Sequence, residues 1–137
     1  MIPSSMAGAI VARLNESMVD LLPGGVARGL RTVETPVPYG SLADITAADW
    51  LTTGRSYYAE ALYQLTIVAR SIDDLETIAD RVKAVLRIGM VPLEFQAGTH
   101  GIAVAGPLRY MGEEVADDGT SLHQGYIEIT TGANRSY

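Results

Sequence analysis

Two histidines are the residues of this chain best suited to chemistry: His100 lies in the segment AGTHGIA and His123 in the segment TSLHQGY. An imidazole can move a proton or bind zinc, but a zinc site needs three or four ligands that converge on one ion. Neither histidine has a second histidine or a cysteine at metal-ligand spacing, and the 137-residue chain contains no cysteine. We therefore expect no metal site and no cofactor, and we expect His123 to be a hydrogen-bonding surface residue of a strand.

A second group with chemical potential is the acidic segment EEVADD. Its acids are Glu113, Glu114, Asp117 and Asp118. Paired carboxylates can serve as acid and base, and ADDGT resembles the start of a calcium loop. However, Ser121, His123 and Gly125 stand where such a loop would place its later ligands, and Asp-Gly is a common turn dipeptide. We therefore interpret this segment as the solvated end of a β-hairpin.

Motifs for covalent catalysis and for phosphate binding are missing from the sequence. It has neither a G-x-S-x-G elbow nor an S-x-x-K motif, and the glycine-rich stretch GTHGIAVAG lacks the G-x-x-x-x-G-K of a phosphate-binding loop. Well-formed structural signals without a catalytic constellation favour a binding or assembly role, so we do not expect an enzyme.

Composition indicates a globular, acidic protein. Hydrophobic residues make up 47% and charged residues 19%, and the net charge of −6 argues against broad binding to nucleic-acid backbones. The beginning, MIPSSMAGAIVARLNESMVDLL, lacks the basic first region of a signal peptide, and Arg13, Glu16 and Asp20 interrupt its apolar run. We expect a helix of the mature protein there, and a soluble chain that stays in the cytoplasm where it is made.

The first half of the chain predicts a helix, an irregular arm and a short strand. Ser4 and Ser5 can cap a helix over about 5–22, whose apolar residues recur at helical spacing. A proline-containing arm follows over about 24–40, because Pro36 and Pro38 cannot donate to a central sheet ladder. A short strand is expected over 39–46.

A strand joined directly to a helix is predicted over about 57–88, in the segment YYAEALYQLTIVARSIDDLETIADRVKAVL. Strict alternation gives the strand one fully apolar face, whose residues are Ala61, Tyr63, Leu65, Ile67 and Ala69. Ser71 and Asp74 form the S-x-x-D signature of a helix start.

Two or three further strands are expected over about 91–131, at 91–96, 102–115 and 122–131, with the last residues ANRSY as a frayed tail. The element order predicts one α+β domain spanning 1–137. We expect a mainly antiparallel sheet of four or five strands with two principal helices packed on one face.

A few residues outside the predicted core could contact a partner. They are Arg28, Arg31, Trp50, Tyr57 and Tyr58. The two arginines either bind an acidic partner or are solvated loop residues, and Trp50, the only tryptophan, is either a core anchor or a half-exposed interface aromatic.

The order of these segments resembles the tail-terminator, or tail-completion, proteins of long-tailed phages and gene transfer particles. The resemblance covers about residues 7–131. It is carried by the N-terminal helix, ETPVPYGSL, ADWLTTGRSYYAEALYQLTIVARS running into IDDLETIADRVKAVL, and EEVADDGTSLHQGYIEITT. It implies a virion protein at the tail-neck junction, assembled in the host cytoplasm, that forms a ring, usually of six copies.

The resemblance also implies partners. The ring would cap the finished tail tube, contact the major tail tube protein and a head-neck connector protein, and let DNA pass without sequence-specific binding. Two other functions remain open. One is another head-tail connector, a stopper or adaptor, and the other is a stand-alone α+β domain that binds a small ligand.

Overall fold

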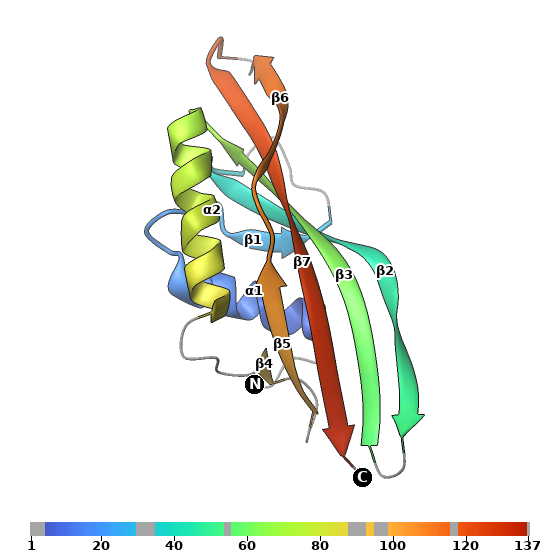
Figure 1. The fold of residues 1–137 in the computed structure, drawn as a ribbon. Coiled ribbons are helices and arrows are strands. Elements are labelled where there is room, and N and C mark those ends of the chain that lie inside the picture. Colours follow the sequence, from blue (N-terminus) through green and yellow to red (C-terminus); the bar gives the residue numbers. More distant parts are fainter. Residues whose placement is uncertain are drawn as a thin grey trace.

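The structure is a computed structural model that describes residues 5–29, 35–53, 56–87, 93–94, 99–115 and 118–136. Two helices pack on one face of a long, curled sheet (Figure 1). In chain order the elements are α1 (Met6–Ser17), β1 (Val26–Arg28), β2 (Tyr39–Thr53), β3 (Ser56–Ala69), α2 (Ile72–Arg87), β4 (Leu93–Glu94), β5 (Thr99–Ala105), β6 (Arg109–Val115) and β7 (Ser121–Ser136). The expected α+β class is confirmed.

The sheet order is β1-β2-β3-β7-β5-β4, with β6 also paired to β7. Every pairing is antiparallel except that of β1 with β2. The described part of the chain thus holds seven strands, where the sequence predicted four or five. The difference arises because β1 is too short to show a period and because the strand expected over 102–115 is two strands, whereas the strand expected over 91–96 is present as the shorter β4.

The core lies between the two helices and the central strands. Alternation along β3 predicted its apolar face correctly: Leu65 and Ile67 are fully buried, as are Ile127 and Ile129 on the neighbouring β7. The helices contribute the stripe that their periodicity predicts, and its fully buried members include Ile10, Leu14, Leu75, Ile78 and Val82. Burial of branched and aliphatic side chains in one cluster supplies the main favourable free energy of folding.

The direct joint between strand and helix is confirmed. β3 ends at Ala69, and the Ser71 Oγ accepts a hydrogen bond from the backbone N–H of Asp74 at 3.1 Å, which satisfies one of the free amides at the start of α2. At the start of α1, the Ser5 Oγ accepts from the backbone N–H of Gly8 at 3.1 Å.

Helix α1 ends at Ser17, well before the expected end near residue 22. The last turn of α1 contacts β1 through a polar side chain. The Asn15 carboxamide accepts a hydrogen bond from Val26 N at 2.7 Å and donates to Val26 O at 2.9 Å, which ties the last turn of α1 to β1. Helix α1 has its C-cap at Met18, directly after this contact.

Two strands are longer than the sequence predicted. β2 continues to Thr53 instead of ending near Thr46, and β7 continues to Ser136, so the expected frayed tail is wrong. Both extensions pair with β3 along its whole length, up to Thr53 with Ser56 and Ser56 with Ser136. Pairing with β3, and for β7 also with β5, fixes segments whose own sequence is poor in strand signals. Figure 1 shows β2, β3 and β7 continuing past the two helices.

The break between β5 and β6 lies at Pro107. Both strands pair antiparallel with β7: Ala105 is opposite Ile129, and Arg109 is opposite Tyr126. The connection from Ala105 to Arg109 therefore has one residue more than the facing segment of β7. A proline is tolerated here because the strand lies at the edge of the sheet, where a missing N–H breaks no ladder.

Candidate interaction surface

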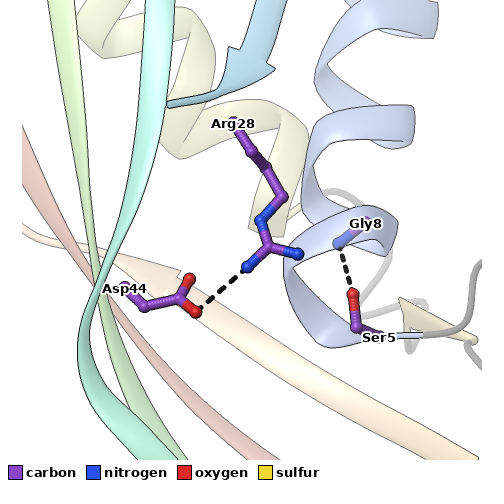
Figure 2. Close-up of polar contacts among 4 residues, drawn as sticks. All are labelled: Ser5, Gly8, Arg28 and Asp44. Atoms are coloured by element: carbon purple, nitrogen blue, oxygen red, sulfur yellow. Dashed lines mark hydrogen bonds and ion pairs between the residues drawn. The ribbon is translucent and has the colours of Figure 1, made fainter. Parts of the chain in front are cut away.

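Arg28, predicted at a contact surface, lies on β1 and forms an ion pair with Asp44 of β2. Its Nη2 lies 3.0 Å from the Asp44 Oδ2, and the two side chains are 51% and 49% exposed. Figure 2 shows the guanidinium between β2 and the first turn of α1. Arg28 is therefore held by its own chain and is not a free cation, which weakens the idea that it alone recruits an acidic partner.

The three aromatic residues predicted at the interface all belong to the β2–β3 hairpin. Trp50 pairs in register with Ala59, Tyr58 with Leu51 and Tyr57 with Thr52. The backbone thus brings them to the part of the hairpin beyond the helices, far along β2 from the ion pair of Arg28. The burial of their side chains lies outside what the structure describes, as does Arg31 altogether, so the two interpretations of Trp50 both stand.

Tyr63 of β3 lies close to the ion pair of Arg28 and Asp44. It is buried and stands opposite Asp44 in the β2–β3 register. Burial raises the pKa of the Tyr63 hydroxyl, the negative charge of Asp44 raises it further, and Arg28 partly opposes both. The Arg28–Asp44 ion pair thus lies close enough to Tyr63 to affect its pKa.

Of the residues singled out for chemistry, His123, Glu114 and Asp118 make structural contacts at the β6–β7 hairpin, His100 lies on β5, and Asp117 lies outside the described residues. Tyr110 Oη lies 3.0 Å from His123 Nδ1, as expected for a surface hydrogen bond of His123, and the amide of Gln124 donates to Glu114 at 3.1 Å. The Thr120 hydroxyl and backbone N–H both donate to Asp118, which lowers the pKa of that carboxyl. This pattern is that of a turn, as predicted.

In the part of the chain that the structure describes, no three acidic or histidine side chains gather closely enough to hold a metal ion. A shallow hollow of about 270 Å³ lies between the loop after α1 and the first half of α2. It is lined by Asp20, Leu21, Pro23, Pro38, Asp74, Thr77 and Ile78. Open and weakly polar, it lacks the convergent polar groups of a small-ligand site. No described helix is long and apolar enough to cross a membrane.

Exposed apolar side chains gather on the edge strands, a feature that the sequence reasoning missed. The large apolar residues that remain exposed are Val19, Ile45, Ile72, Ile102, Val104, Tyr110, Met111 and Val115. All of them except Val19 and Ile72 lie on β2, β5 or β6. The alternation of Ile102, Ala103 and Val104 could have indicated two apolar residues on the face opposite the core, but only the sheet order identifies β5 as an edge strand.

Neither a protein-family model nor a curated protein matches the chain. A chain from the virion of a native gene transfer agent particle has a similar structure, with a TM-score of 0.56 at 12% sequence identity. The alignment covers 97% of this chain and 96% of that chain. A second solved chain, 17% identical, aligns over 97% of this chain and 98% of its own length with a TM-score of 0.49. The fold of this chain is therefore one that also occurs in a gene transfer agent virion.

Proposed function

We propose that this protein is a structural component of a phage or gene transfer virion, and within it the tail terminator. In this role several copies, we expect six, form a ring on the finished end of the tail tube and provide the joint to the head neck. The observation that carries the proposal is the similarity to a gene transfer agent virion chain over nearly the full length of both chains.

Other properties of the molecule support an assembly role. Most of the exposed large apolar residues lie on strands, and on the β6–β7 hairpin Tyr110 bonds to His123 and Gln124 to Glu114. The net charge of −6 keeps free copies apart and would let DNA pass through the ring without adhering to it. The protein would act without a cofactor and would be found in the virion, after assembly in the host cytoplasm.

Purified protein mixed with isolated tail tubes tests this function. We expect monomers or weak oligomers when the protein is dilute, and rings when it is concentrated or supplied with tubes. Sedimentation velocity measures the first and negative-stain electron microscopy the second, with rings seated on tube ends that no longer extend. Isolated monomers and bare tube ends at every concentration would contradict the proposal, and binding to a neck component but not to tubes would indicate a stopper or adaptor.

A further inference from the structure

The edge of the sheet next to the helices is closed by the chain itself. β1 pairs with β2 over only Gly40, Ser41 and Leu42. On its other side, the Asn15 carboxamide occupies both the N–H and the C=O of Val26, as a neighbouring strand would. A further strand therefore finds no free backbone at Val26, so this part of the edge is protected against strand addition.

Beyond Leu42, no described residue pairs with β2 on this side. On its other side, β2 pairs with β3 up to Thr53, with register shifts between Asp44 and Thr46 and between Thr46 and Asp49. The opposite edge has a comparable opening: β4 covers β5 at His100 and Gly101, whereas the segment from Ile102 to Ala105 pairs only with β7 within the described chain. Within the described part of the chain, each side of the sheet thus has a stretch of backbone with a strand partner on one side only.

These two open edges have opposite strand directions. β2 is antiparallel to β3, β3 to β7, and β7 to β5, so β2 and β5 run in opposite directions. If the β2 edge of one copy lay beside the β5 edge of another, the antiparallel alternation of the sheet would simply continue. Strand direction therefore permits β2 of one copy to add to β5 of another.

The side chains at the two edges also match. Val104, Thr130, Leu62 and Thr46 form one cross-strand row, which alternation places on the face away from the helices. Ile45 lies next to Thr46 at a β-bulge, at one end of this row. Val104 forms the other end of the row, and Ile102 lies two residues before it on the same face of β5. The exposed fractions of Ile45, Ile102 and Val104 are 50%, 48% and 47%, so each edge has apolar surface left to bury.

From these observations we propose that copies of this chain join head to tail, the open β2 edge of one against the open β5 edge of the next. Ile45 of one copy packs on Ile102 and Val104 of its neighbour. The inference rests on the proposed function and identifies the contact by which the ring closes. Two different surfaces of one chain that fit each other give a heterologous interface, the kind that generates rings.

Lysine substitutions at the two edges test the contact, because a lysine on an edge strand opposes strand addition. We expect Ile45→Lys and Val104→Lys each to remain monomeric at concentrations where the unaltered protein forms rings, with the same circular dichroism. Val19→Lys is the matched control: it places the same charge on an exposed apolar residue of the helix layer and should leave ring formation unchanged.

Mixing the two variants separates a head-to-tail contact from a symmetric one. Ile45→Lys keeps its β5 edge and Val104→Lys keeps its β2 edge, so an equimolar mixture should give one-to-one dimers that cannot grow. Sedimentation velocity and native mass spectrometry would show them. Dimers of either variant alone would mean that like edges pair, and would overturn the proposal.

A milder variant guards against loss of folding. Val104→Thr keeps the shape and strand preference of valine, and we expect ring association about tenfold weaker, because one buried methyl group is replaced by a hydroxyl. If the unaltered protein forms rings and all these edge variants form them equally well, this inference fails while the proposed function stands. If the unaltered protein forms no rings even with tail tubes, both fail.

Discussion

Central and edge strands of the same sheet use apolar side chains for different purposes. In the centre, Leu65 of β3 and Ile127 of β7 are paired in register and fully buried beneath the helices. At the edges, Ile45, Ile102 and Val104 keep about half of their surface in water. The central residues are fully used in folding the chain. The edge residues contribute less to folding, and this difference is what makes the edges available for a second copy.

The largest expected effect that tests this contrast is the loss of a central side chain. Leu65→Ala removes a fully buried leucine from the middle of the core and should lower the free energy of unfolding by about 2–5 kcal/mol. Val104→Ala, the matched change at the edge, should cost about 0.5 kcal/mol or less. Urea denaturation of the dilute monomer measures both values, and equal losses would remove the distinction between centre and edge.

The next effect concerns the closed part of the edge. Asn15→Ala removes both hydrogen bonds to Val26 and frees its N–H and C=O, so we expect a loss of about 1–3 kcal/mol in stability. The freed edge should also promote irregular aggregates in place of rings. Asn15→Asp is the control, because it keeps the acceptor for Val26 N and loses only the donor. Light scattering that stays at the level of the unaltered protein would show that Asn15 does not guard the edge.

A smaller effect is expected at the joint between β3 and α2. Ser71→Ala removes the side-chain acceptor for the Asp74 amide and should cost about 1 kcal/mol. Ser71→Asp should restore most of this, since aspartate caps a helix start equally well. Thermal denaturation followed by circular dichroism measures the difference. Ring formation should persist in both variants, because the joint lies far from the proposed contact.

The smallest effect is confined to alkaline pH and concerns the buried Tyr63 of β3. Burial and Asp44 raise the pKa of Tyr63 above its ordinary value of 10.0, so the folded protein holds a proton that the unfolded chain releases. The stability that this proton represents is present below pH 10 and is lost as pH rises through the folded pKa. Tyr63→Phe should flatten this loss in urea titrations between neutral and alkaline pH, and an unchanged slope would contradict the assignment.

The secure predictions from sequence were those that rest on local chemistry. The alternation along β3 and the periodicity of α2 predicted both buried faces, and Ser5 and Ser71 cap the helices as expected. The errors concern boundaries and contacts across the fold. Helix α1 ends at Ser17, and the last turn bonds to β1 through Asn15, while β7 continues along β3 to Ser136; a local pattern encodes neither contact.

The predicted contact residues stay a prediction. The aromatic residues and arginines were chosen by residue type. The structure gives the backbone positions of the three aromatics on the β2–β3 hairpin and the ion pair of Arg28 with Asp44. Aliphatic residues such as Ile102 look like ordinary core residues in a sequence. Whether such a residue is buried or exposed depends on which strand pairs next to it, and strand order is not a local property.

The sequence by itself determined that this chain folds as α+β, which faces of its long strand and second helix are apolar, and that it has no cysteine chemistry, because composition and period act over neighbouring residues. Only the tertiary structure decided which strands lie at the edges, where those edges are closed and which apolar residues stay in water. These properties depend on pairings between segments far apart in the chain, such as β3 with β7 and Asn15 with Val26.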